Sequence, residues 1–244
     1  MTITAYDAPS LARLGTVLGV WAHPDDETYS CGGLFAAAAA AGGRVVCVTA
    51  TRGEAGSLDH ERWPPASLAA TRTRELDEAL ATLGVREHHW LDYPDGGCAG
   101  VPQDEAVRRI AELIDDVRPD TVLTFGPDGF TGHPDHIAVG HWTAAALVRS
   151  GSTAALHCAT ITPQGWGKLE ELFFTLGMSM GGRPDVTDAG ACSINVELPD
   201  PLRAVKERAV RAQVSQTAGI VESVGEDRFD LFIATESFRL SSTP

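Results

Sequence analysis

The sequence predicts an α/β protein with a mostly parallel sheet that is doubly wound, with helices on both faces. Three apolar runs without a polar face, at residues 16–22, 44–50 and 121–125, are typical of strands buried on both sides. Helix-compatible segments alternate with these runs, and this alternation favours parallel strands joined by right-handed crossovers. Polar loops that contain Gly, Asp and His follow the predicted strands, where open sheets of this class place their ligands.

The composition of each early segment supports its assignment. The helix after the first strand is almost wholly alanine, which is the best helix former and is small enough to pack closely on a sheet. The next two helices are amphipathic, and Gly84 ends one of them while Pro119 follows the other. In chain order we predict strand 16–22, helix 28–42, strand 44–50, helix 67–83, strand 88–92, helix 104–117, strand 121–125 and helix 137–148.

After residue 148 the pattern becomes looser. The segment 177–190 begins with an apolar, glycine-rich run at 177–182, which is compatible with a lid or with a plain connecting loop. In this part of the chain we predict strand 154–161, strand 193–196, helix 199–214 and strand 231–235.

Length and charge limit the classes of function. A chain of 244 residues fits one domain, which we expect over residues 1–244, with a core at about 14–150 and a C-terminal extension of it at about 151–240. A net charge of −14 opposes nucleic-acid binding, because such proteins gather a basic surface. Since no segment resembles a signal peptide or is long and apolar enough to span a bilayer, we expect a cytoplasmic protein. The five scattered cysteines indicate reduced, mostly buried thiols, and a homo-oligomer is compatible with the composition.

Two similar motifs follow predicted strands. Residues 23–27 read His-Pro-Asp-Asp-Glu, and residues 132–136 read Gly-His-Pro-Asp-His. If the two strands are parallel neighbours, both motifs lie at the same edge of the sheet. His23, Asp26 and His136 can then supply two imidazoles and a carboxylate, a catalytic zinc set that leaves a position for water.

A structural explanation competes with this one. A single His-Pro-Asp sequence is typical of a helix N-terminus, with Pro at the first helical position and an acid in the first turn. Either motif alone leaves that explanation open. Two such motifs at equivalent junctions, each with a further ligand-type residue, favour a metal site.

The two motifs, together with Gly32 and Gly33, resemble the signature of the PIG-L/LmbE-like deacetylases over about residues 17–147. The resemblance implies a Rossmann-like, zinc-dependent hydrolase that removes an N-acyl group, which we expect to be N-acetyl, from a glucosaminyl small molecule. A His₂-carboxylate site also suits ferrous iron, so the residues alone leave the metal open. A non-catalytic metal- or sugar-binding module of the same fold is the alternative.

The resemblance also implies roles for individual residues. His23, Asp26 and His136 bind the metal, Asp25 acts as general base, and a protonated His133 stabilises the oxyanion. Asp135 is expected to orient one of the two downstream histidines. Glu54, Arg72 and Asp95 are expected to contact the substrate, although Arg72 and Glu75 are also spaced as an ordinary surface pair on a helix.

The chain departs from the family pattern at two places. Thr131 stands where some members carry a tyrosine that helps to hold the oxyanion. Residues 213–216 read Gln-Val-Ser-Gln, where many members have His-x-Ser-Gln. The sequence therefore predicts an altered pocket around intact metal ligands.

Overall fold

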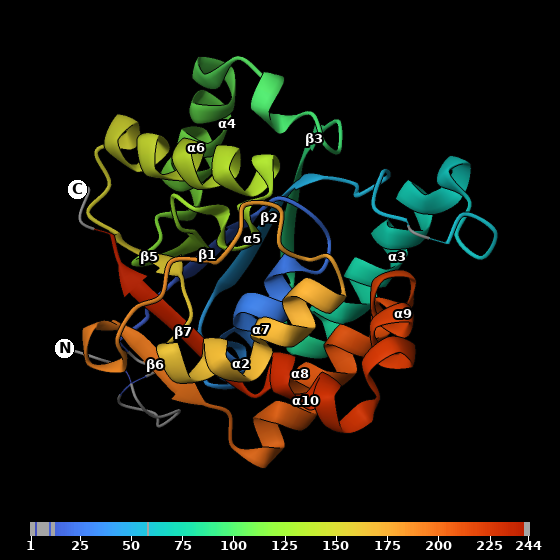
Figure 1. Cartoon of the computed structure of the whole chain (residues 1–244). Coiled ribbons are helices and arrows are strands. Elements are labelled where there is room, and N and C mark those ends of the chain that lie inside the picture. Colours follow the sequence, from blue (N-terminus) through green and yellow to red (C-terminus); the bar gives the residue numbers. More distant parts are fainter. Residues whose placement is uncertain (1–2, 4–9, 11–12, 58, 242–244) are drawn as a thin grey trace.

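The computed structural model describes residues 3, 10, 13–57 and 59–241 of the 244-residue chain. A seven-stranded sheet with the order β3-β2-β1-β4-β5-β7-β6 crosses the molecule (Figure 1). Its strands are β1 (Val17–Trp21), β2 (Val45–Thr51), β3 (Glu87–Tyr93), β4 (Thr121–Phe125), β5 (Ala155–Ala159), β6 (Ile194–Glu197) and β7 (Thr235–Leu240). The helices are α2 (Asp26–Ala40), α3 (Pro65–Leu83), α4 (Gln103–Val117), α5 (Gly129–Gly132), α6 (Pro134–Ser150), α7 (Pro163–Thr175), α8 (Asp200–Ala212), α9 (Val214–Val224) and α10 (Glu226–Ile233), with 3-10 turns at Cys98–Gly100 and Ala189–Ala191.

The first five strands are parallel, as the alternation of segments predicts. In β1, Val17 and Leu18 pair with Val45 and Val46 of β2 on one side, and β4 pairs with β1 on the other. Every residue of β1, β2 and β4 is buried, which explains their uninterrupted apolar sequences. The sequence prediction of a mostly parallel α/β sheet is thus confirmed.

Of the two strands that complete the sheet, β7 runs antiparallel to the first five and β6 runs in the same direction as they do. β7 pairs with β5, and β6 pairs with β7 at the sheet edge. The predicted strand at 231–235 is wrong in its placement, because residues up to Ile233 belong to α10 and the strand begins at Thr235. Phe229, Phe232 and Ile233 are buried at helical spacing, and this packing decides the state of a short apolar run whose period is ambiguous.

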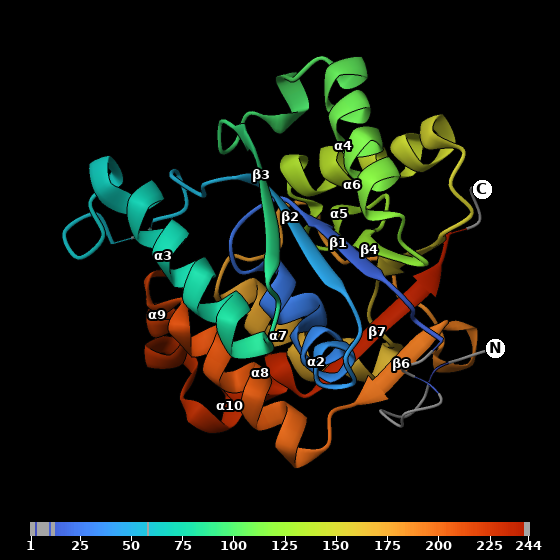
Figure 2. The same cartoon turned by 180° about the vertical axis from the view of Figure 1, so that it is seen from behind.

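Helices cover both faces of the sheet. α4 and α6 lie together on one face, while α2, α3 and α8 lie on the other (Figures 1 and 2). Beyond α2 and α8, the C-terminal helices α7, α9 and α10 form an additional layer (Figure 1). That layer carries its own apolar cluster, built around Trp166, Leu172 and Phe229, next to the main core of the sheet. No helix among the described residues is long and apolar enough to cross a membrane.

Candidate active site

The two motifs meet at the carboxyl edge of the parallel sheet. His23 follows β1 closely, and Asp26 opens α2. His136 lies in the first turn of α6, after the loop that leaves β4. Because β1 and β4 are adjacent and parallel, their carboxyl ends bring these three residues together, although His23 and His136 are 113 positions apart.

The ligand atoms of this trio form a compact triangle. His23 Nδ1 lies 3.2 Å from His136 Nε2 and 3.6 Å from Asp26 Oδ2, and His136 Nε2 lies 3.3 Å from Asp26 Oδ1. A tetrahedral zinc ion with ligand bonds of about 2.0–2.2 Å separates its ligand atoms by about 3.3–3.6 Å. The donor types and their spacing therefore fit a divalent metal.

The tautomer of His136 suits the same role. Its Nδ1 lies 3.0 Å from the carbonyl oxygen of Gly129, so this nitrogen carries the proton that is donated, and Nε2 is left with a lone pair toward the triangle. The hydroxyl of Thr131 lies 3.2 Å from the same Nδ1. Phe125 stacks on the ring, with centroids 4.1 Å apart, and restricts its orientation. In this chain the Thr131 hydroxyl thus contacts the ring of His136.

Two carboxylates lie behind His23. Its Nε2 is 3.0 Å from Asp95 Oδ1 and 3.3 Å from Asp135 Oδ2. Asp135 is fully buried and also accepts hydrogen bonds from the backbone N–H groups of Gly96 and Cys98. The carboxylate of Asp135 therefore contacts the histidine of the first motif, and not the downstream histidines as the resemblance implied. The reason is that α6 packs against the Cys98–Gly100 turn, which places this side chain beside His23.

The electrostatics of the cluster favour a bound cation. Burial opposes ionisation of Asp26, but His136 and His23 outweigh it and hold the pKa of that carboxyl well below its usual range. Burial lowers the pKa of His136 to about 4, so the ring is neutral near pH 7. Burial also opposes the charged form of His23, yet bonds to Asp135, Asp26 and Asp95 raise its pKa. A divalent ion would replace the proton that these carboxylates attract to His23.

Asp25 lies beside the ligand triangle without belonging to it, and it has its own partner. Its backbone φ of 120° is unusual for a non-glycine residue and separates its direction from that of Asp26. Arg72 Nη2 lies 3.2 Å from Asp25 Oδ2 and also bonds the carbonyl of Pro24, while Nη1 donates to the carbonyl of Gly53 at 2.9 Å. Burial raises the pKa of Asp25 to about 7, against the lowering effect of Arg72.

Arg72 reaches the site, and the surface-pair interpretation is wrong. Its side chain is buried, and α3 directs it under the loop between Gly53 and Gly56. Glu75 does not pair with it. The Glu75 carboxylate instead accepts bonds from the backbone and the hydroxyl of Ser215 and ties α3 to α9.

His133 is held by its own helix. It is the N-cap residue of α6, and its Nδ1 accepts the backbone N–H of Asp135 at 3.1 Å. A nitrogen that accepts a hydrogen bond carries no proton, so Nε2 is the protonated nitrogen of a neutral ring. Burial, together with the nearby His23, also lowers the pKa of His133. This geometry favours a neutral donor over the protonated histidine expected from the resemblance.

The substrate residues expected from the sequence separate into two groups. Arg72 and Asp95 line the cavity next to the triangle. Glu54 does not line it, because its Oε1 accepts the backbone N–H of Asp95 at 2.9 Å, while Ala55 N–H donates to Asp95. Glu54 therefore supports the Asp95 loop from behind.

Two further residues join the C-terminal part to the first motif. Gln213, 1% exposed, donates to Glu27 Oε1 and accepts from the hydroxyl of Thr28, each at 2.8 Å. Glu27 Oε2 in turn accepts the backbone N–H of Asp25. Sequence reasoning assigned no role to Glu27, and its place in the first motif was the available signal. The sequence showed Gln213 only as a departure from the family's His-x-Ser-Gln pattern. In the structure it places a buried side-chain amide at this position.

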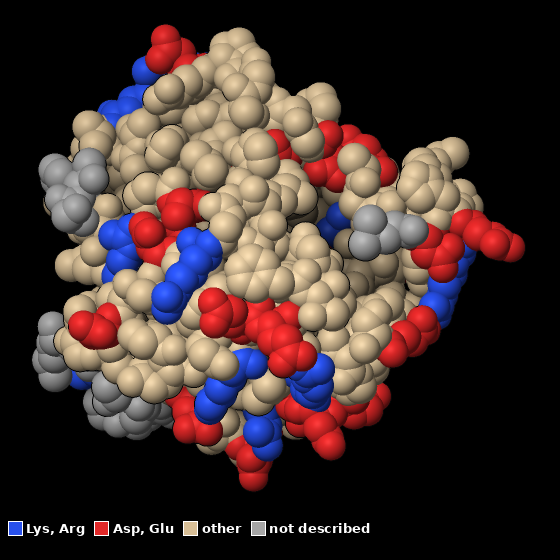
Figure 3. All heavy atoms as spheres, in the orientation of Figure 1, with Lys and Arg blue, Asp and Glu red and all other residues tan. Residues whose placement is uncertain are grey.

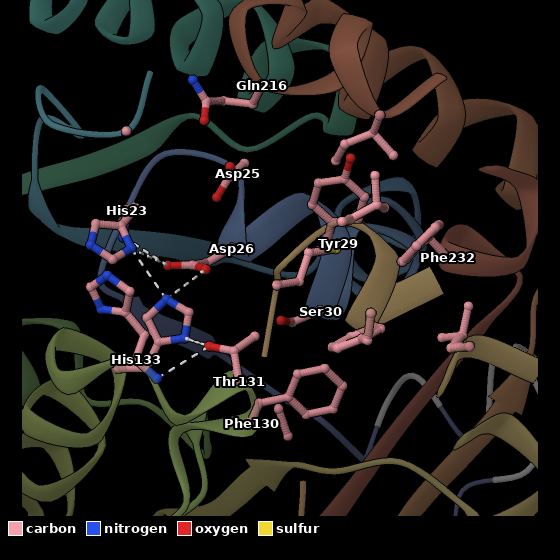
Figure 4. A pocket seen from close by; sticks show the side chains of 18 of the residues that line it. His23, Asp25, Asp26, Tyr29, Ser30, Phe130, Thr131, His133, Gln216 and Phe232 are labelled. Carbon is pink, nitrogen blue, oxygen red and sulfur yellow. Dashed lines mark hydrogen bonds and ion pairs between the residues drawn. The ribbon is translucent and has the colours of Figure 1, made fainter. Parts of the chain in front are cut away.

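The cluster opens into a cavity of about 610 Å³. Figure 4 shows His23, Asp25, Asp26 and His133 around one end, with Tyr29, Phe130 and Phe232 farther along. On the outside, Figure 3 shows a hollow in this face of the molecule. The volume lies within the range of small-molecule sites.

Fold and site together define a doubly wound α/β protein in which two histidines and a carboxylate, at a spacing that fits a divalent metal, meet at the carboxyl edge of the sheet with a further carboxylate beside them. Residues 18–147 match the PIG-L family, described as GlcNAc-PI de-N-acetylase. The chain belongs to this family.

Relatives support the assignment over a longer stretch. A 1D-myo-inositol 2-acetamido-2-deoxy-alpha-D-glucopyranoside deacetylase of Kineococcus radiotolerans is 35% identical over 194 residues, which cover 67% of this chain and 54% of that protein. The protein of the same name from Corynebacterium glutamicum strain R is 31% identical over 230 residues, covering 82% of this chain and 74% of its own length. This chain thus spans about half of the first relative and three quarters of the second.

Solved structures show the same fold at lower identity. N,N'-diacetylchitobiose deacetylase from Pyrococcus horikoshii is 23% identical, with a TM-score of 0.66 over 93% of this chain and 83% of that one. The A40926 pseudoaglycone deacetylase Dbv21 gives 0.69 at 19% identity, over 95% and 99%. The hydratase GalB from Pseudomonas putida KT2440 also shares the fold, with a TM-score of 0.58 at 17% identity, covering 93% of this chain and 95% of GalB. The reaction must therefore be argued from the site.

Proposed function

We propose that the protein is a zinc-dependent N-deacylase that hydrolyses the amide of a glucosaminyl small molecule. The observation that carries the proposal is the triangle of His23, Asp26 and His136 beside the Asp25 carboxylate. Family membership and the names of the relatives, which are deacetylases of an inositol glucosaminide, support the substrate class. A binding module would have no need for a carboxylate base next to the ligands.

The residues divide the work of amide hydrolysis among them. Bound zinc would supply a water of lowered pKa and polarise the carbonyl. Asp25 takes the proton of the attacking water and returns it to the leaving amine, so that the amide and water become a carboxylate and an amine. Arg72 keeps this carboxylate oriented and favours its ionised form. His133 donates Nε2–H to the oxyanion that develops on the carbonyl oxygen.

Metal content and amine release test the proposal together. The protein loaded with zinc should release free amine from N-acetylglucosaminides, including an inositol glucosaminide, and Asp25→Asn should bind as much metal but lose most of the activity. His136→Ala should lose metal, whereas His141→Ala, an exposed position on the same helix, should keep it. Full metal content in His136→Ala, or no amine from any N-acyl glucosaminide, would contradict the proposal.

A further inference from the structure

The cavity extends well beyond the reaction centre, and most of this extension is apolar. Its walls come largely from the C-terminal layer, where α7, α9 and α10 carry the second apolar cluster. In Figure 4 Phe130 and Phe232 lie on the far side of Asp26 from His23, and Gln216 lies in another direction. Six apolar side chains that line the extension are Phe130, Leu169, Phe173, Met178, Ile220 and Phe232.

The apolar wall begins directly beside the metal ligands. Phe130 precedes Thr131 in α5, and its φ of 62° and ψ of −55° are strained values for a bulky residue. The Phe130 ring lines the cavity, where it meets Phe173 with centroids 6.0 Å apart. Strain of this kind persists only where surrounding structure imposes it, and it is concentrated at functional sites.

A methionine-bearing loop covers the same space. The loop at 177–182 is anchored to α5, because the backbone N–H of Met180 donates to the carbonyl of Thr131 at 2.8 Å. Met178 lines the cavity, and Met180 lies at its mouth with 63% of its surface exposed. Flexible thioether side chains adapt to apolar groups of different shape.

Charged groups at the cavity wall do not contradict this apolar character, because several are paired with each other. Arg62 bonds Glu222 at 3.0 Å. Glu236, fully buried, bonds Lys206 and the backbone N–H groups of α2. The charged side chains of Arg72 and Asp95 line the other end of the cavity, beside the ligand triangle.

From these observations, and resting on the deacylase function proposed above, we infer that the N-acyl group of the substrate is a lipophilic chain longer than acetyl. The scissile carbonyl must lie at the ligand triangle, and it joins the sugar nitrogen to the acyl chain. The sugar hydroxyls match the end with Arg72 and Asp95, so the chain enters the apolar extension. With an acetyl group, water would fill that space, and contact between water and the apolar side chains is unfavourable. Hydrolysis then yields a lipophilic carboxylate and the free amine.

A chain-length series tests the inference. The zinc-loaded enzyme is assayed with N-acetyl, N-butanoyl, N-hexanoyl and N-octanoyl glucosaminides that share one aglycone, with amine release as the readout. Each buried methylene can raise kcat/KM by up to about fourfold, so we expect a gain of at least about tenfold from acetyl to octanoyl. A second series keeps the acetyl group and lengthens an alkyl aglycone.

Two variants on α9 test whether the apolar side chains of the extension cause the selectivity for acyl-chain length. Ile220→Asn places an amide in the extension, and Val214→Asn is the matched control because Val214 is exposed and does not line the cavity. The octanoyl-to-acetyl ratio of kcat/KM should fall at least about fivefold in Ile220→Asn and stay unchanged in Val214→Asn. Metal-loaded Asp25→Asn, titrated calorimetrically with the same acyl series, reports binding without turnover and should bind the octanoyl compound more tightly.

The outcomes separate this inference from the proposed function. Equal or falling kcat/KM along the acyl series, with acetyl hydrolysed, overturns the long chain and leaves the deacylase intact. A dependence on the aglycone series alone assigns the apolar space to the aglycone and overturns the inference. If no compound is hydrolysed, the function fails, and calorimetric affinities that do not increase with acyl length then overturn the inference as well.

Discussion

The buried Arg72 and the partly buried Asp25 form an ion pair, with Nη2 3.2 Å from Oδ2, at the place where α3 passes behind the first motif. The guanidinium also bonds the backbone carbonyls of Pro24 and Gly53, so three groups of the site depend on one side chain. Arginine suits this position because its planar fork serves several acceptors at once, which the point charge of lysine cannot do.

We predict that Arg72→Lys lowers kcat/KM by about 10- to 100-fold through misplacement of the base. Arg72 lowers the pKa of Asp25, so weakening this contact should raise it. Since the base must be deprotonated, the acid limb of the kcat/KM profile should move to higher pH. Arg74→Lys, an exposed position on the same helix, is the control, and an unshifted limb in Arg72→Lys would exclude the proposed electrostatic role.

The hydrogen bond that His133 accepts from Asp135 N–H leads to a second prediction. His133→Ala should retain zinc and lower kcat by about 10²- to 10³-fold, as for a lost oxyanion donor. Because the ring is a neutral donor, both limbs of the pH profile should remain in the variant. Loss of the alkaline limb would show that the imidazolium is the active form. His133→Gln, which keeps an N–H donor, should recover part of the rate.

Backbone packing at Gly132 gives a third prediction. Its φ is +77°, and a Cβ there would lie 2.3 Å from the backbone nitrogen of Gly181 in the methionine loop. Left-handed backbone costs a non-glycine residue about 1–2 kcal/mol, and Gly132→Ala should destabilise the fold by more than this amount. The variant should also lower kcat/KM, because the loop at 177–182 is detached. Gly151→Ala has a similar φ of +65° with open space around it and reports the strain alone. Equal thermal shifts in both variants would argue against tight packing of the loop.

A fourth prediction concerns stability at low pH. Burial lowers the pKa of His157 to about 4, and its Nδ1 lies 2.8 Å from the hydroxyl of Ser193. The unfolded chain, with a histidine pKa of about 6.5, binds this proton first as the pH falls. Neutral His157 therefore makes its full contribution to the free energy of unfolding above about pH 6.5. This contribution, at most about 3 kcal/mol, is lost as the pH falls to about 4.

His157→Gln should flatten the dependence of the unfolding free energy on pH between these values, as measured by urea denaturation. His60→Gln changes an exposed histidine and should leave the slope as it is. An unchanged slope in His157→Gln would show that another group titrates.

The sequence alone determined the sheet class and the grouping of His23, Asp26 and His136. β1, β2 and β4 are buried on both faces, so their sequences are apolar throughout and recognisable without contacts. Two motifs placed just after parallel strands are forced to one edge of the sheet, which is why His23, Asp26 and His136 could be grouped before any distance was known.

Only the tertiary structure decided what the other side chains contact. Arg72 and Glu75 share a helical spacing that local rules interpret as a surface pair, yet packing of α3 against the site buries one and ties the other to Ser215. The carboxylate of Asp135 contacts His23, whereas Glu54 bonds the Asp95 backbone and faces away from the cavity. Loop conformation sets both directions. The placement of α10 and β7 likewise depends on long-range contacts, since a short apolar run has no decisive period and its state is chosen by what packs against it.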